Sequence, residues 1–88
     1  SPNDKRLHWY LKLNNKLEAI LVSDKDADMS AACLDVWIGS ALEPKTRPGL
    51  AHFCEHMLFM GTEKYPRENE YGEFLKNNGG YSNAYTAL

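Results

Sequence analysis

The chain has 88 residues, which is enough for one domain with a modest hydrophobic core. Its ten Lys and Arg residues are scattered among twelve Asp and Glu residues, and the net charge of -2 provides no basic field to attract nucleic acid or anionic lipid. No apolar run approaches the ~20 residues that a membrane-spanning helix needs, so we expect neither nucleic acid nor a membrane as a partner.

Two strands joined by a tight turn are predicted near the start of the chain. Apolar and polar residues alternate over residues 7–13, which predicts a half-buried strand. Asn14 and Asn15 follow, and both tolerate the left-handed conformation of a hairpin turn, so a second strand is expected over residues 16–22. His8 lies on the polar face of the first strand, where a solvated side chain is favoured over a metal ligand.

The next segment contains an acidic loop and a third predicted strand. The loop has acidic residues at alternate positions, Asp24, Asp26 and Asp28. A calcium loop is disfavoured because the sixth position lacks glycine and the twelfth would be Asp35 in place of a bidentate Glu. Residues 31–38 are almost continuously apolar, which predicts an interior strand covered on both faces.

A helix is expected from Pro48 to Met60, because Pro suits a first helical turn and Gly61 is a suitable C-terminal stop. Apolar residues occupy most of its circumference, which predicts that it is buried on most sides. Offsets of three and four residues return to the same face of a helix, and one such stripe contains His52, Glu55, His56 and Phe59.

Three of these residues form the motif H-x-x-E-H, the inverse of the H-E-x-x-H motif of zinc peptidases. His52 and His56 can converge on one metal ion, while Glu55 stays beside the metal, within reach of a bound water. A shuffled chain of this composition would contain the motif about one time in a hundred. The alternative is purely structural, with both histidines as satisfied core residues and no metal.

A second, amphipathic helix is predicted over residues 67–77, and Asn78-Gly79-Gly80 should end it. Its glutamates, Glu68, Glu70 and Glu73, are expected on the solvated face rather than as metal ligands. Residues 81–88 should resume as an extended segment.

The two cysteines, Cys33 and Cys54, lie far apart and form no CxxC motif. They are expected to be buried, reduced thiols, and Cys54 lies about 200° around its helix from the histidines, so it cannot share their metal. The first six residues also lack the apolar core of a signal peptide. The native N-terminus need not be Ser1, so this absence says little about targeting. The reduced cysteines favour a cytoplasmic location.

Taken together, the residues resemble the pitrilysin, or insulinase, family of inverted-motif zinc metallopeptidases. The resemblance is carried by residues 52–62, 64–66, 68–71 and 82–86 and continues upstream, so it covers essentially the whole chain. It implies an α+β fold with an antiparallel or mixed sheet and helices packed on one face. Residues 1–88 would then be the N-terminal part of a truncated catalytic domain.

The resemblance also implies roles for individual residues. His52 and His56 match the two histidine ligands of one Zn²⁺ ion, and Glu55 matches the catalytic glutamate. Asn83 and Ala84 match positions that hold the peptide backbone. A side-chain pocket would be lined by Tyr85 and Phe59, although Phe59 can equally be a core aromatic residue.

The expected function is that of a zinc-dependent metalloendopeptidase that hydrolyses small or extended peptides. In the family the third zinc ligand is a glutamate in a later helix, at a position beyond Leu88. We therefore expect the remaining domains of a larger enzyme as partners, alongside peptide substrates, and an inactive chain when residues 1–88 stand alone. The alternative is a non-catalytic homologue that only binds peptide or scaffolds a complex.

Overall fold

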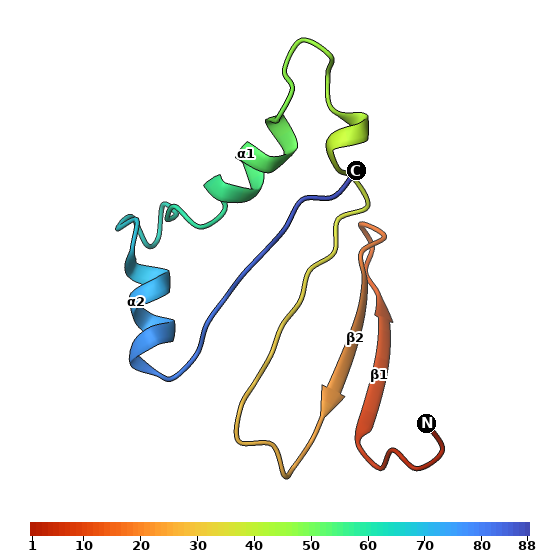
Figure 1. Cartoon of the computed structure of the whole chain (residues 1–88). Coiled ribbons are helices and arrows are strands. Elements are labelled where there is room, and N and C mark those ends of the chain that lie inside the picture. The colour runs from red at the N-terminus through yellow and green to blue at the C-terminus, as the bar shows by residue number, and fades with distance from the viewer. The chain divides into compact units, whose positions relative to one another are not determined.

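The computed structural model describes all 88 residues and divides them into two units, Ser1–Leu34 and Asp35–Leu88. The first unit contains strands β1 (Leu7–Lys12) and β2 (Glu18–Ser23) (Figure 1). The second contains the short 3-10 helix η1 (Ser40–Leu42) and helices α1 (Leu50–Met57) and α2 (Glu70–Asn77). Strands and helices in one chain confirm the predicted α+β class. No helix is long and apolar enough to cross a membrane.

β1 and β2 form an antiparallel hairpin whose register runs from Leu7 opposite Ser23 to Lys12 opposite Glu18. Its turn differs from the expected one, because the left-handed residue is Lys16, with φ 71°, rather than an asparagine. The second strand therefore begins and ends later than the predicted range of residues 16–22, because residue 16 belongs to the turn.

The predicted interior strand over residues 31–38 is not formed. Residues 31–36 have no regular structure, no second chain segment pairs with the predicted strand, and the Trp37 side chain is 96% exposed. An apolar run becomes a central strand only when neighbouring strands satisfy its backbone groups and other layers cover its faces. Neither condition is met, so the prediction of a strand covered on both faces was wrong.

Helix α1 begins two residues later than predicted, because Gly49 takes a left-handed conformation (φ 87°) immediately before it. No side chain at that position caps the helix. Instead the Glu43 carboxylate accepts the N–H groups of Gly49 at 2.6 Å and Ala51 at 3.0 Å. These bonds from Ala51 and Gly49 lower the pKa of Glu43.

The end of α1 agrees more closely with the expected stop. After Met57 the chain continues in a tighter turn, in which the Met60 N–H donates to the Met57 carbonyl at 3.2 Å. Gly61 follows with φ 99°, a conformation that favours glycine. The helical turn therefore reaches Met60, as predicted, although the regular α-helix ends three residues earlier.

The expected burial of α1 is not observed. No apolar side chain of the chain is buried, and Phe53 on α1 is 64% exposed. Cys33 and Cys54 are free thiols, as predicted, but both are exposed rather than buried. A helix buries its apolar face only against another layer of structure, and η1 is the one helix or strand of its unit that α1 contacts.

Helix α2 begins three residues later than predicted and ends at the predicted place. At its start Arg67 pairs with Glu70 at 3.7 Å and Glu73 at 3.4 Å, which places these carboxylates in surface ion pairs. At its end Gly79 has φ 72°, and the Gly80 N–H donates to the Leu75 carbonyl at 2.7 Å. This is the glycine-dependent termination that the Asn-Gly-Gly sequence predicts.

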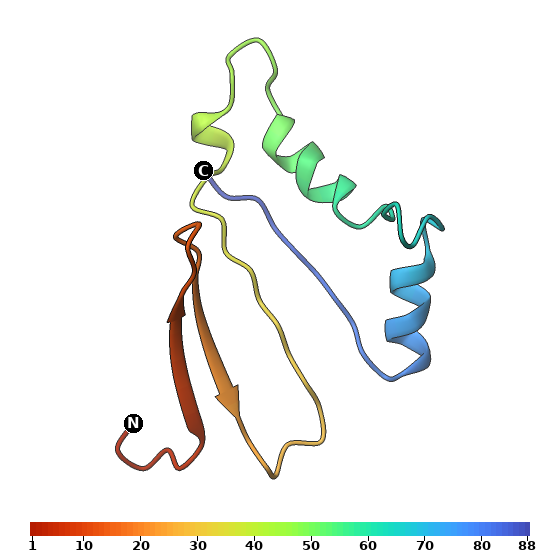
Figure 2. The same ribbon diagram turned by 180° about the vertical axis from the view of Figure 1, so that it is seen from behind.

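Residues 81–88 return from the end of α2 towards η1, as both views show (Figures 1 and 2). They form no strand, but the Ser40 N–H donates to the Ala87 carbonyl at 2.9 Å. Gly39 is buried beside this contact. The C-terminal segment is therefore held against the start of η1.

Candidate metal centre

Helix α1 brings the two predicted ligands together. The Nε2 atoms of His52 and His56 lie 3.0 Å apart, and their rings are tilted by 45° with centroids 4.7 Å apart. Two nitrogens bound to one tetrahedral zinc ion, each at ~2.0–2.1 Å, are separated by roughly 3.3 Å. The observed separation is slightly shorter, because the two rings are within hydrogen-bonding distance of each other, and it places both nitrogens where they can bind one ion.

Glu55 lies beside this pair without taking part in it. Its Oε2 atom is 4.0 Å from Nε2 of His52, and the glutamate side chain is 17% exposed whereas that of His52 is 64% exposed. The spacing of three residues places the carboxylate on the same face of the helix as His52. The three motif residues of the predicted stripe therefore lie together on α1, whereas Phe59 lies beyond the last residue of the helix.

Glu55 also contacts a second segment of the chain, a contact that the sequence did not predict. The Thr86 hydroxyl donates to Oε2 of Glu55 at 3.0 Å across 31 residues of sequence. Thr86 was part of the family-like stretch 82–86, but nothing in its sequence environment indicated a contact with α1. Such a contact depends on how the chain returns after α2, which residue spacing does not encode.

No further His, Cys, Asp or Glu side chain joins His52 and His56 as a third metal ligand. No three His, Cys, Asp or Glu side chains gather into a group that could hold a metal ion. His8 lies in the hairpin unit, where its Nε2 atom is 3.4 Å from the Asp4 carboxylate. The chain thus supplies two converging imidazoles, fewer than the three protein ligands of a catalytic zinc site.

The residues expected to contact a peptide lie on the segment that contains Thr86. Asn83, Ala84 and Tyr85 are exposed, and the Tyr85 side chain is 89% exposed. Neither the Asn83 amide nor the Tyr85 hydroxyl forms a hydrogen bond within the chain. These residues therefore lie one to three positions before Thr86, which contacts Glu55, and their side chains are exposed to solvent.

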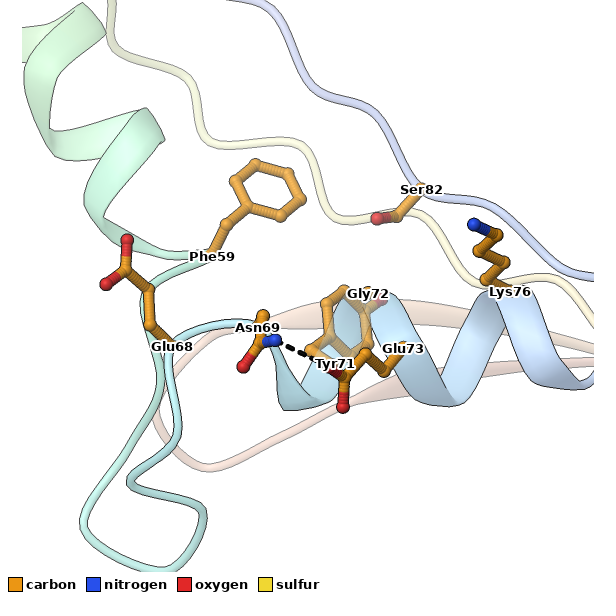
Figure 3. A pocket seen from close by; sticks show the side chains of 8 residues that line it. All are labelled: Phe59, Glu68, Asn69, Tyr71, Gly72, Glu73, Lys76 and Ser82. Carbon is orange, nitrogen blue, oxygen red and sulfur yellow. Dashed lines mark hydrogen bonds between the residues drawn. The ribbon is translucent and has the colours of Figure 1, made fainter.

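Phe59 lines an open pocket of about 340 Å³ between the end of α1 and helix α2 (Figure 3). Its ring faces that of Tyr71, with centroids 6.5 Å apart. Ser82 from the C-terminal segment also lines the pocket, whereas Tyr85 does not. The expectation that Phe59 and Tyr85 line one side-chain pocket for a substrate stays a prediction.

A family model and individual relatives of known proteins both match this chain. Residues 18–88 match the family model described as Insulinase (Peptidase family M16). The chain is 58% identical over 84 residues to the A-factor-processing enzyme of Saccharomyces cerevisiae, covering 96% of this chain and 8% of that protein. It is 55% identical over 87 residues to the insulin-degrading enzyme of Mus musculus, covering 99% of this chain and 8% of that protein.

The fold has a solved counterpart as well. The crystal structure of pitrilysin matches 99% of this chain and 9% of its own chain, with a TM-score of 0.82 and 38% sequence identity. The chain therefore spans less than a tenth of the length of the relatives it matches.

Proposed function

This chain belongs to the insulinase family of peptidases, peptidase family M16, and on that basis we propose that it forms the zinc-binding part of a metalloendopeptidase catalytic domain. The observation that carries the proposal is the 3.0 Å approach of the His52 and His56 Nε2 atoms with Glu55 beside them. The substrates are peptides, and the remaining domains of a longer protein enclose them.

His52 and His56 are the residues that would hold the metal through their Nε2 atoms. A catalytic zinc site has three protein ligands, so we assign the third, a glutamate, to a part of the protein outside residues 1–88. Zn²⁺ bound there would supply Lewis acidity, which polarises a carbonyl and makes water more acidic.

Glu55 is assigned the role of general base. Its carboxylate takes a proton from the water that attacks the scissile carbonyl, and then delivers that proton to the departing amine as the C–N bond breaks. The position supports this role because Glu55 lies 4.0 Å from the His52 imidazole, next to the metal ligands but separate from them.

The extended segment 81–88 is the proposed binding strand for the peptide. Its backbone makes no strand ladder, and Asn83 and Ala84 are exposed, so their groups are available to pair with an extended peptide. Main-chain pairing of this kind gives affinity with little dependence on side chains. Tyr85 and Phe59 would then contact substrate side chains.

The test is the variant Glu55→Gln in the full-length protein, measured as peptide hydrolysis together with zinc content. Removal of a general base should lower kcat by about 10²–10⁴-fold while zinc stays bound, because the histidines are intact. Glu63→Gln is the matched control, since Glu63 is an exposed glutamate in the loop after α1. Retained turnover in Glu55→Gln would eliminate Glu55 as the base.

The same measurements separate the alternatives. A wild-type protein that binds peptide and zinc but cleaves nothing would support a non-catalytic homologue. Absence of zinc from the wild-type protein would support the purely structural role of the two histidines. Residues 1–88 alone, with two imidazole ligands and no carboxylate ligand, should show no measurable proteolysis.

A further inference from the structure

Thr86 is the one residue from outside α1 whose side chain bonds to the H-x-x-E-H stripe. Its hydroxyl donates to Oε2 of Glu55 at 3.0 Å, and both residues are half-buried in a chain where most side chains are exposed. A hydrogen bond to a carboxylate is stronger than one between neutral groups. The contact is therefore able to fix the direction of the Glu55 side chain.

The geometry leaves one carboxylate oxygen available. Thr86 bonds to Oε2, which is also the oxygen 4.0 Å from Nε2 of His52, while Oε1 of Glu55 has no hydrogen-bond partner in the chain. Glutamate has several rotatable bonds, so without a partner its carboxylate would sample many directions. With Oε2 held, Oε1 is presented as the free acceptor.

Thr86 is itself held in place by its neighbours. Ala87, the next residue, accepts the Ser40 N–H at 2.9 Å and lies against Gly39. Threonine is also stiff about its first side-chain bond because it is β-branched. The hydroxyl therefore projects from an anchored backbone rather than from a free chain end.

We propose that Thr86 is a positioning residue, which orients the Glu55 carboxylate so that Oε1 can accept a proton. This role rests on the proposed function, because it concerns the general base of that reaction. It also connects two parts of the site, because the segment of residues 81–88 that binds the peptide in the proposed function also orients the carboxylate of Glu55. Thr86 acts through Glu55 and does not itself touch the reacting atoms.

The test compares Thr86→Val and Thr86→Ser in the full-length protein, with kcat, KM and zinc content measured for a peptide substrate. Valine has the shape of threonine but no hydroxyl, so kcat should fall by about 10- to 100-fold, the range expected for loss of a hydrogen bond to a charged group. KM and zinc content should stay unchanged. Serine keeps the hydroxyl and should restore kcat to within about threefold of wild type.

Thr46→Val is the matched control, since it makes the same chemical change at an exposed loop residue. If Thr86→Val does not fold, Thr86→Ala removes the hydroxyl with a smaller side chain and makes the same test.

Three results would overturn the positioning role while leaving the proposed function intact: an unchanged kcat in Thr86→Val, an equal loss in Thr86→Ser, or a loss that follows zinc content. A wild-type protein without peptidase activity would instead remove the proposed function itself.

Discussion

Substitution of Gly39 by alanine should damage the site without touching any residue that carries chemistry. Gly39 has φ -149°, an extended conformation that alanine adopts freely, so the obstacle is steric. An added Cβ would overlap the Ala87 carbonyl oxygen and lie 3.0 Å from both the Ala87 carbonyl carbon and the Leu88 carbonyl oxygen. All three are backbone atoms, which cannot move aside as a side chain can.

The size of the effect follows from the displacement that relieves this overlap. Ala87 must move by about 1 Å to regain ordinary contact, and a shift of that size would stretch the 3.0 Å bond from Thr86 to Glu55 beyond hydrogen-bonding range. A misplacement of ~1 Å near a catalytic group can reduce the rate by about 10²-fold. We therefore expect kcat to fall by up to about 100-fold, as in Thr86→Val.

The assay is steady-state hydrolysis of a fluorogenic peptide by the full-length protein, with circular dichroism and zinc content as checks on folding and the metal. If Gly39 acts through Thr86, the double variant Gly39→Ala/Thr86→Val should be no slower than Thr86→Val alone, because both remove the same interaction. Ser40→Ala is the control, since it adds no Cβ and keeps the backbone N–H that donates to Ala87. Full activity in Gly39→Ala, or additive losses in the double variant, would refute the reasoning.

Two further predictions concern the helices. Backbone N–H groups at the start of α1 hold the pKa of Glu43 below the ordinary value for glutamate. Their bonds to Glu43 therefore stabilise the helix at pH values above that ordinary pKa, and the contribution is lost as pH falls through the lowered one. Far-ultraviolet circular dichroism from pH 7 to pH 2 should therefore show a steeper loss of helix in wild type than in Glu43→Gln, and identical curves would contradict the cap. Gly79→Ala, at φ 72°, should lower the free energy of unfolding by about 1 kcal/mol, whereas Gly72→Ala inside α2, with open space around its Cβ, should raise it by up to ~1 kcal/mol. Urea unfolding measures both, and equal signs would be inconsistent with the assigned conformations.

Local signals in the sequence predicted the local parts of the structure. Alternation placed the hairpin, and the spacing of His52, Glu55 and His56 placed their side chains on one face, because both depend only on backbone periodicity. Glycines at 61 and 79 mark helix ends because few other residues adopt positive φ. These features require no information about the rest of the fold.

Features that depend on distant partners were not predictable in the same way. Residues 31–38 have the composition of an interior strand, yet composition cannot supply the neighbouring strands that would complete it. The burial expected for α1 fails for the same reason, since an apolar face is buried only when another layer covers it. The hydrogen bond from Thr86 to Glu55 joins residues 31 positions apart, so no periodic pattern indicates it.

The similarity to known enzymes surrounds the H-x-x-E-H motif on both sides. The 55–58% identity to the two enzymes extends over nearly the whole chain, so the H-x-x-E-H motif occurs in the context of a family rather than as an isolated match. The roles proposed for Asn83, Ala84 and Tyr85 rest on the resemblance to this family, because their exposed side chains alone would not indicate a binding strand.

The most direct test of the account is to locate zinc in crystals of the full-length protein by anomalous diffraction at the zinc absorption edge. The account predicts one ion within ~2.0–2.1 Å of Nε2 of both His52 and His56, with Glu55 outside the coordination sphere. An ion bound elsewhere, or two imidazoles that bond only to each other in a zinc-replete protein, would contradict it.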